Sequence, residues 1–198
     1  MEQFSCKTKI VSGSGATAYL KELKSRKLLV VSDPYFMENG VAEKLAGLSG
    51  AAEYRTFHDI CPDPTVELAA AGTALVREFM PDTVVALGGG SAIDCAKAMV
   101  YFGGVAVTFV AIPTTSGSGS EVTDFAVLTH GSTKHPLVDE KLRPDVAILD
   151  SALLENLPKG LIADTGFDVL THALEGYVAT GRSGFTDALA KDAFTVVY

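Results

Sequence analysis

The order of its short apolar runs is the feature that most constrains how this chain can fold. Five runs rich in β-branched and apolar residues are separated by longer segments; they are residues 28–32, 52–57, 83–87, 107–112 and 146–149. Most of them are apolar throughout, which suits strands of a parallel sheet buried on both faces. Strands that alternate with helices predict βαβ units. We therefore expect an α/β domain built around a parallel sheet.

The segments between these runs have helical periodicity. Residues 41–48 and 92–102 show it, and apolar residues recur at helical spacing after Asp63-Pro64. The aspartate there is expected to cap the helix and the proline to occupy its first turn. Residues 124–130 and 134–138 depart from this alternation, since they flank Gly131-Ser132 and predict a β-hairpin insert.

No strand is expected after residue 149, and the pattern becomes helical beyond Pro158. We place a boundary near residue 160, with an α/β domain over residues 1–160 and the first helices of a second domain over 161–198. The last helical pattern reaches residue 198 without a Gly or Pro stop signal. Since roughly 40 residues of helix form a poor independent core, we expect the second domain to be truncated.

The charge and composition exclude several classes of function. A net charge of −8 argues against a nucleic-acid surface, because phosphate binding needs a basic patch. A dinucleotide is still compatible, since backbone N–H groups can hold its pyrophosphate. No apolar run approaches the roughly 18 residues of a membrane span, and the N-terminus lacks the features of a signal peptide. The three cysteines have no metal-ligand spacing, and we expect reduced thiols in a cytoplasmic protein.

A cluster of three glycines stands at a strand-to-helix junction. Gly88, Gly89 and Gly90 lack side chains, so that a ligand can approach the backbone closely. The first N–H groups of the following helix are unpaired and carry partial positive charge, which suits a pyrophosphate. Ser91 and Asp94 have capping-box spacing and are expected to fix the helix start. The alternative is a glycine-rich turn with a good cap and no ligand.

The cluster matches neither of two familiar phosphate-binding motifs. It lacks the spacing of a phosphoryl-transfer loop, and it is not the G-x-G-x-x-G of a first βα unit. An acid at a strand end, Asp33, precedes the glycines instead of following them. Asp33 can hydrogen-bond a ribose and repel a 2′-phosphate, or it can cap the helix that starts at Pro34. The sequence leaves both roles open.

A second loop of small residues follows another apolar strand. Thr114, Thr115 and Ser118 offer hydroxyl groups there, and two glycines allow unusual backbone angles. The loop is either a flexible linker or a binding loop. Its position directly after a core strand favours binding, because ligands of α/β sheets lie at the carboxyl ends of strands.

An acid and a histidine are spaced by four residues in the helical region. Asp168 and His172 therefore lie on one helix face and can hold one divalent ion together. A surface contact without metal is the alternative. Thr165 and Asp168 also have capping-box spacing, which would place them at a helix start.

Three stretches together resemble the iron-containing (group III) alcohol dehydrogenase family. They are Gly88–Lys97, Pro113–Glu121 and Gly166–Tyr177, and the similarity runs over essentially the whole chain. The resemblance implies a dehydroquinate synthase-like α/β domain that binds NAD or NADP. An all-helical domain that binds Fe²⁺ or Zn²⁺ would follow it. It also implies a small alcohol or aldehyde as substrate, and a homodimer.

The resemblance assigns roles to particular residues. The pyrophosphate would lie at the start of the glycine-led helix, and the adenosine side would contact the hydroxyl loop. Lys134 would reach the nicotinamide ribose, while Asp33 favours NAD. Asp168 and His172 match two of four metal ligands. The cofactor-binding candidates are thus Asp33, Gly89, Gly90, Ser91, Asp94, Thr114, Thr115, Ser118 and Lys134.

The chain departs from the family pattern in two ways. Ser118 stands where the family more often has threonine, and this change keeps the hydroxyl group. The other two metal ligands of the family are histidines of the later helical domain, and the remaining histidines here lie in other segments. We therefore expect the 198-residue chain to bind dinucleotide weakly or not at all and to have no dehydrogenase activity.

Three rival functions share parts of this pattern. A dehydroquinate synthase-type lyase has the same architecture, but the Thr114–Glu121 loop and the Asp–His spacing argue against it. A zinc-dependent glycerol dehydrogenase relative is closer, and Ser91 weighs mildly against it. The third rival is a nucleotide-binding module without catalytic activity.

Overall fold

A parallel sheet of six strands forms the centre of the chain, whose computed structural model describes residues 4–198. Its strands run in the order β1-β8-β5-β4-β2-β3, and every pairing is parallel. The strands are β1 (Lys9–Ser12), β2 (Lys27–Ser32), β3 (Glu53–Phe57), β4 (Thr83–Gly88), β5 (Thr108–Pro113) and β8 (Val146–Leu149). The five strands expected from the sequence are confirmed. β1 was not predicted, because it is a short edge strand whose residues are mostly exposed.

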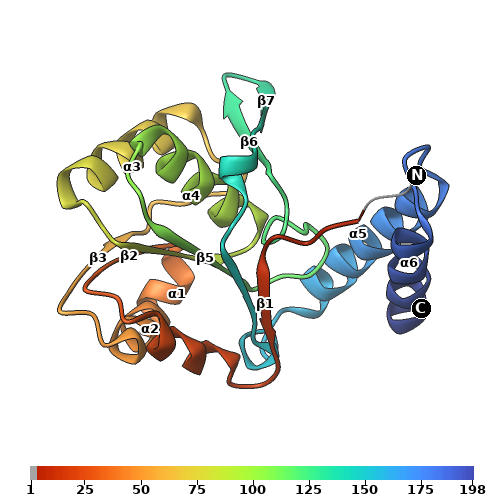
Figure 1. Cartoon of the computed structure of the whole chain (residues 1–198), viewed down its shortest axis with the longest axis horizontal. Coiled ribbons are helices and arrows are strands. Elements are labelled where there is room, and N and C mark those ends of the chain that lie inside the picture. Colours follow the sequence, from red (N-terminus) through yellow and green to blue (C-terminus); the bar gives the residue numbers. More distant parts are fainter. Residues whose placement is uncertain (1–3) are drawn as a thin grey trace.

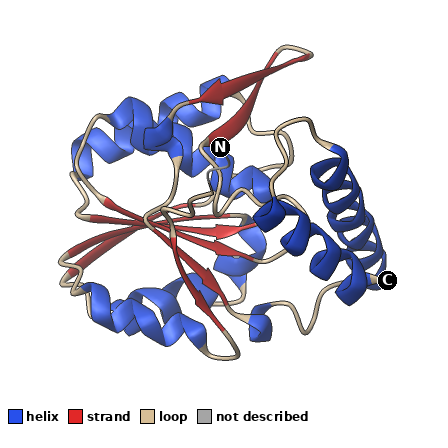
Figure 2. Ribbon diagram, turned by 45° about the vertical axis from the view of Figure 1, so that its right-hand side comes forward, coloured by secondary structure: helices blue, strands red, loops and turns tan. Residues whose placement is uncertain are grey.

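Helices cover both faces of this sheet (Figures 1 and 2). One face carries α3 (Val66–Phe79) and α4 (Gly90–Gly103); the other carries the 3-10 helix η1 (Ala16–Leu23), α1 (Pro34–Glu38) and α2 (Val41–Ser49). Two short 3-10 turns, η2 (Glu140–Leu142) and η3 (Ser151–Leu153), flank β8. The α/β layering expected from the sequence is therefore confirmed.

Strand β4 shows how the sheet supplies two cores. Val84 and Ala86 join the cluster beneath α3 and α4, which includes Met99. Val85 and Leu87 join the cluster on the opposite side, beneath α1 and α2. Successive side chains of a strand point to opposite faces, so a strand that is apolar at every position fits a sheet covered twice.

The expected helix caps are wrong at three helices. Helix α3 is capped by Thr65, whose Oγ1 accepts a hydrogen bond of 3.1 Å from the amide of Leu68. Asp63 lies outside the helix with a left-handed φ of 55°. Helix α4 has Gly89 at its N-cap with no side-chain cap, so the Ser91–Asp94 capping box does not form.

The third wrong cap concerns α5 (Lys159–Val178), which begins six residues before Thr165. Thr165 and Asp168 therefore lie inside the helix, where the hydroxyl of Thr165 hydrogen-bonds the carbonyl of Leu161 at 2.8 Å. A hydroxyl followed by an acid three residues later occurs inside helices as well as at their starts. Spacing alone could not distinguish the two positions.

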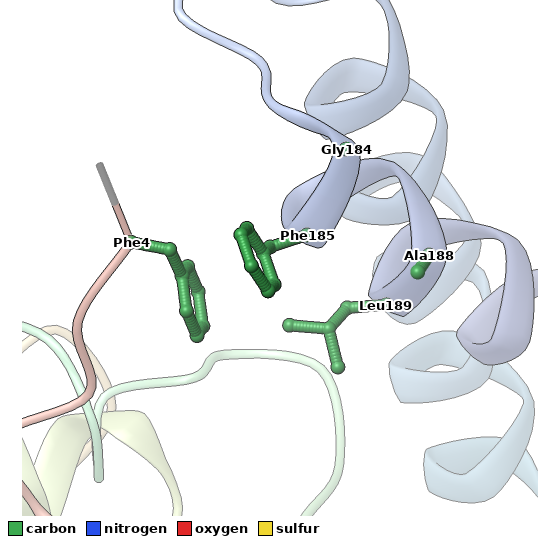
Figure 3. A pocket seen from close by; sticks show the side chains of 5 residues that line it. All are labelled: Phe4, Gly184, Phe185, Ala188 and Leu189. Atoms are coloured by element: carbon green, nitrogen blue, oxygen red, sulfur yellow. The ribbon is translucent and has the colours of Figure 1, made fainter. Parts of the chain in front are cut away.

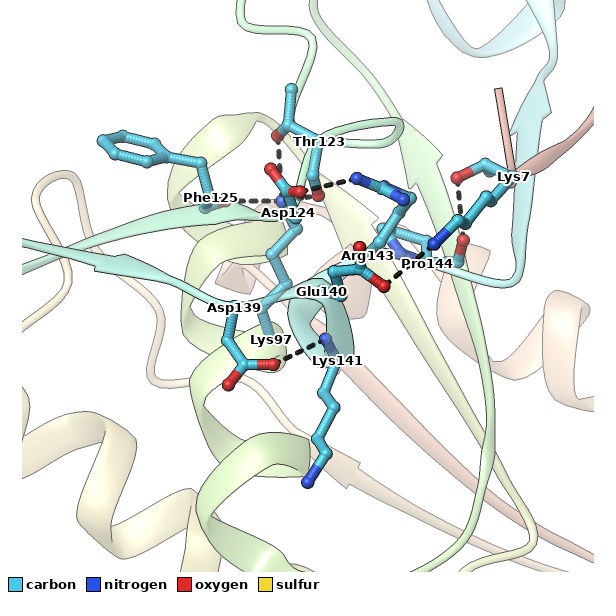
Figure 4. Close-up of polar contacts among 11 residues, drawn as sticks. Lys7, Lys97, Thr123, Asp124, Phe125, Asp139, Glu140, Lys141, Arg143 and Pro144 are labelled. Carbon is cyan, nitrogen blue, oxygen red and sulfur yellow. Dashed lines mark hydrogen bonds and ion pairs between the residues drawn. The ribbon is translucent and has the colours of Figure 1, made fainter. Parts of the chain in front are cut away.

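The predicted hairpin is confirmed as an antiparallel pair, β6 (Phe125–His130) and β7 (Thr133–Val138), with Gly131 at a φ of 61° in its turn. Its first strand is attached to α4 by two side chains. Asp94 Oδ2 accepts a 2.9 Å hydrogen bond from the amide of Val127. Lys97 is 1% exposed, and its Nζ donates to backbone oxygens of Thr123 and Phe125 (Figure 4).

Helices α5 and α6 (Gly184–Val197) form a pair beside the sheet and its helical layers (Figure 1). The two helical segments predicted after Pro158 are thus confirmed. The N-terminal segment reaches this pair, since the Phe4 and Phe185 rings stack at 5.8 Å beside Leu189 (Figure 3). Large apolar side chains along both helices are exposed. Across residues 4–198 we find no helix with the length and apolarity needed to cross a membrane.

Candidate dinucleotide and metal site

The candidate site lies at the carboxyl end of the sheet, between β2 and β4. These strands are neighbours, yet the helices that follow them cover opposite faces: α1 follows β2, and α4 follows β4. Such a reversal opens a crevice in which ligands of α/β sheets bind. Asp33 follows β2 directly at this crevice. Gly88 ends β4 there, and Gly89 and Gly90 lead into α4.

The start of α4 presents unpaired backbone donors to the crevice. Gly89, Gly90 and Ser91 are all partly exposed, and no hydrogen bond found within residues 4–198 uses their amides. The next amide, that of Ala92, already donates to Gly89 at 3.1 Å. Free amides at a helix N-terminus, together with the helix dipole, attract an anion. The turn can therefore receive a phosphate group without a basic side chain.

The loop 114–120, which comprises residues Thr114–Ser120, packs closely against the glycine turn. A Cβ on Gly89 would lie 3.1 Å from Thr115 Oγ1, and a Cβ on Gly90 would lie 3.1 Å from Ser118 Cβ. The buried Thr114 amide also donates a 3.0 Å hydrogen bond to the carbonyl of Gly88. The sequence suggested that the glycines make room for a ligand. In the structure Gly89 and Gly90 also leave room for this loop, which packs against the turn.

Two cavities adjoin the glycine turn. The larger has a volume of about 600 Å³, within the range of roughly 300–1,000 Å³ typical of small-molecule sites. The smaller, of about 350 Å³, also includes Ser91. Both are lined in part by Asp33 and Gly89. The sequence analysis did not predict one wall of the larger cavity, because its residues form no motif. These residues include Leu153, Asn156, Leu157, Pro158 and Leu161.

Asp33 has a different environment at each carboxylate oxygen. Oδ1 accepts a 3.3 Å hydrogen bond from the amide of Phe36, which confirms the helix-cap role. Oδ2 faces the turn, 3.3 Å from where a Cβ on Gly88 would lie. Burial raises the pKa of Asp33, and the amide hydrogen bond of Phe36 opposes that rise. Capping by one oxygen leaves the other available to a ligand in the crevice.

Loop 114–120 also contacts helix α5. Ser116 Oγ lies 3.0 Å from Thr165 Oγ1, and the carbonyl of Gly117 lies 2.7 Å from His172 Nδ1. The loop is therefore in contact with both the glycine turn and the helix that carries the Asp–His pair. It connects the two elements, and these contacts favour the binding-loop interpretation over a flexible linker.

The Asp168–His172 pair fits part of a metal site. Nε2 of His172 lies 4.0 Å from Oδ1 of Asp168, and the side chains are 53% and 48% exposed respectively. Two donors bound to one ion at about 2.0–2.2 Å each can be at most about 4.4 Å apart, so this separation is compatible with a shared divalent ion. Within residues 4–198, no third His, Cys, Asp or Glu groups with them.

Two predicted cofactor residues are engaged elsewhere. The carboxylate of Asp94 is directed to the hairpin, as its hydrogen bond from Val127 shows. Lys134 Nζ lies 2.6 Å from Asp63 Oδ1. Asp63 follows Cys61 and Pro62, which line the smaller cavity. The structure thus brings Asp33, Gly89, Ser91, Thr114 and Thr115 to the cavities, with Gly90 and Ser118 adjoining, but pairs Lys134 with an acid beside them.

Comparison with known proteins agrees with this geometry. The family model described as iron-containing alcohol dehydrogenase matches residues 7–151. The chain belongs to the iron-containing alcohol dehydrogenase family. The family match favours the alcohol dehydrogenase interpretation over a dehydroquinate synthase-type lyase. The parallel-sheet α/β fold described above superposes on a solved iron-containing alcohol dehydrogenase.

One curated relative and two solved structures align with nearly the whole chain. It is 43% identical to 1-propanol dehydrogenase PduQ of Citrobacter freundii, covering 100% of this chain and 55% of that protein. The iron-containing alcohol dehydrogenase structure from Thermococcus thioreducens superposes with a TM-score of 0.93 at 33% identity, over 99% of this chain and 59% of that one. The structure of sulfoacetaldehyde reductase from Bifidobacterium kashiwanohense in complex with NAD⁺ superposes with a TM-score of 0.92 at 30% identity, over 100% of this chain and 58% of that one. The chain spans about half the length of the curated relatives it matches.

Proposed function

We propose that this chain is the NAD-binding part of a metal-dependent alcohol dehydrogenase that interconverts a small alcohol and its aldehyde. The observation that carries the proposal is the set of free amides at Gly89–Ser91, located where the strand order reverses. A diphosphate bridge of a dinucleotide suits that site. The family membership supports the reaction class, and the name of the PduQ relative supports a short alcohol such as 1-propanol.

The cofactor would lie across the glycine turn. Its pyrophosphate would accept hydrogen bonds from the amides of Gly89, Gly90 and Ser91, and its adenosine side would occupy the larger cavity beside Asp33 and the loop hydroxyls. A carboxylate at Asp33 would accept from a ribose hydroxyl and repel a 2′-phosphate, which favours NAD over NADP. A contact between Lys134 and the nicotinamide ribose would replace the present Lys134–Asp63 ion pair.

Asp168 and His172 would hold the metal, with Nδ1 of the histidine bonded to a carbonyl and Nε2 free for the ion. Fe²⁺ and Zn²⁺ both accept such nitrogen and oxygen donors. When bound, the ion supplies Lewis acidity to the alcohol oxygen and the nicotinamide ring accepts the hydride. The role of this chain is to hold the two reactants next to each other, since loop 114–120 contacts both the turn and α5.

A catalytic ion normally has about three protein ligands and an open position. The pair described here supplies two, so we expect the 198-residue chain to hold metal weakly and to lack dehydrogenase activity. Turnover of propanol with NAD⁺ by the purified chain would contradict this expectation. We place residues 161–198 in the helical metal-binding part, with the boundary near residue 160.

Ser91 offers a test that separates binding from folding. Ser91→Asp adds a negative charge in the first turn of α4, where it favours the helix but repels a pyrophosphate. Ser91→Asn is its uncharged control of nearly equal size. We expect Ser91→Asp to weaken NAD⁺ binding by about tenfold or more without lowering the melting temperature. The NAD⁺ affinity of Ser91→Asn should stay close to that of wild type. Equal NAD⁺ affinity of Ser91→Asp and wild type would overturn the proposal.

A further inference from the structure

Loop 114–120 contacts two elements through different residues. Thr115 and Ser118 pack against the glycine turn, whereas Ser116 and Gly117 contact helix α5. The loop therefore fixes the position of α5 relative to the start of α4. Its closest approach to α5 is at Gly117.

Both backbone conformation and space require glycine at position 117. Its φ is +101°, a region that residues with a side chain rarely adopt. A Cβ there would lie 2.8 Å from the backbone oxygen of Thr165 and 2.8 Å from Asp168 Oδ2. The carboxylate could rotate away, but the backbone oxygen belongs to a helical turn and cannot. Any side chain at 117 would therefore push the loop and α5 apart.

The carbonyl of Gly117 determines which nitrogen of His172 carries the proton. It lies 2.7 Å from Nδ1, and a carbonyl oxygen can only accept a hydrogen bond. The neutral ring therefore carries its proton on Nδ1 and keeps its lone pair on Nε2. Nε2 is the nitrogen that lies 4.0 Å from the carboxylate of Asp168. The lone pair is thus on the ring nitrogen that lies 4.0 Å from the second metal donor.

We propose that Gly117 is the positioning residue for the metal ligands: its carbonyl sets the His172 tautomer, and its missing side chain lets Asp168 approach the loop. This inference rests on the proposed function in taking Asp168 and His172 as ligands. Histidines that bind metals commonly donate their second N–H to a carbonyl or carboxylate, and losing that partner weakens metal binding about 10–100-fold. The same loop packs on Gly89 and Gly90, so it aligns the metal ligands with the cofactor turn.

Gly119 provides a matched control for Gly117. It lies in the same loop with a φ of +63°, but a Cβ there would have nothing within 4 Å. Alanine at either position must adopt a positive φ, which costs more at +101° than at +63°, and only Gly117→Ala would also meet α5. The first readout is the ¹⁵N shift of the His172 ring, measured at a pH where the ring is neutral, without metal or cofactor. We expect Nδ1–H in wild type and in Gly119→Ala, and a mixed or Nε2–H tautomer in Gly117→Ala.

An Nε2–H tautomer of His172 in the wild-type protein would overturn the inference, and this measurement does not depend on whether Gly117→Ala folds. An unchanged tautomer in a folded Gly117→Ala variant would do so as well. Zn²⁺ affinity is the second readout, and it should fall about tenfold or more in Gly117→Ala and little in Gly119→Ala. A loss in His172→Ala but none in Gly117→Ala refutes the positioning role alone. No loss in His172→Ala instead refutes the metal assignment of the proposed function.

Discussion

Lys97 donates a 2.6 Å hydrogen bond from Nζ to the backbone oxygen of Phe125, so one buried ammonium group joins helix α4 to the β-hairpin. The same nitrogen also donates to the backbone oxygen of Thr123 and lies 3.1 Å from the hydroxyl oxygen of that residue. Around it are the carboxylates of Asp94, Glu121 and Asp124 and the guanidinium of Arg143. This buried contact makes the stability of the chain depend on pH.

Burial lowers the pKa of Lys97 from 10.5 to about 8, although the carboxylates of Asp94 and Glu121 oppose the shift. Between pH 8 and the ordinary lysine pKa, the unfolded chain holds a proton that the folded chain has released. The free energy of unfolding therefore rises with pH across that window. From pH 7.5 to 9.5, we expect wild type to gain up to about 2 kcal/mol relative to Lys97→Met. Urea unfolding at both pH values measures this gain, and a flat or falling difference would contradict it.

Asp94 is expected to support the hairpin and not to contact the cofactor. Its Oδ2 accepts the amide of Val127, while the buried Oδ1 has no hydrogen-bond partner among the residues described. Asp94→Ala should lower the free energy of unfolding by about 1–3 kcal/mol, because it leaves the partly buried amide of Val127 without its acceptor. Asp94→Asn keeps an oxygen that can accept from this amide, so it should lower the free energy of unfolding less. Denaturant titration tests the order, and a tenfold loss of NAD⁺ affinity in Asp94→Asn would show a cofactor contact instead.

Asp33 should control the choice between NAD⁺ and NADP⁺. Asparagine keeps the capping oxygen for the amide of Phe36 and removes the negative charge beside the turn. In Asp33→Asn we expect a smaller ratio of NAD⁺ to NADP⁺ affinity, mostly because NADP⁺ binds better. Equilibrium titration with both dinucleotides gives the ratio. A ratio identical to wild type would mean that this carboxylate does not face the ribose.

Two helical glycines should respond to alanine in opposite directions. A Cβ on Gly103, at the end of α4, would lie 2.6 Å from Val76 Cγ1, whereas a Cβ on Gly47 in α2 would have nothing within 4 Å. Gly103→Ala should therefore cost about 1–3 kcal/mol through overpacking. Gly47→Ala should gain about 0.5–1 kcal/mol because alanine favours a helix more than glycine does. Thermal melts of the two variants measure both effects, and a Gly103→Ala variant as stable as wild type would contradict the packing around Val76.

The sequence predicted the elements of this fold better than their ends. Apolar runs specified five strands, and Gly131-Ser132 located the hairpin, since both signals are local. Edge strand β1 has no continuous apolar run and was missed. The cap assignments failed in different ways: Thr65 and Gly89 occupy the N-caps of α3 and α4, and the Thr165–Asp168 spacing lies inside α5.

The site was predictable as a set of residues but not as a set of contacts. Glycines after a strand and hydroxyls after the next strand both indicated the carboxyl edge of the sheet. That Asp94 is directed to the hairpin and Lys134 to Asp63 depends on which elements pack together. The same holds for Gly117, whose carbonyl meets a histidine 55 residues later in the chain. Such contacts have no signal in local spacing.

We expect the free amides at the start of α4 to bind the diphosphate bridge of a dinucleotide. Titrating ¹⁵N-labelled protein with millimolar NAD⁺ tests this directly through the amide resonances. Even though the chain is expected to bind NAD⁺ weakly, the Gly89, Gly90 and Ser91 resonances should shift with NAD⁺ concentration, and more than amides of the hairpin or of α6. Absent shifts at these three residues, or larger shifts elsewhere, would contradict it.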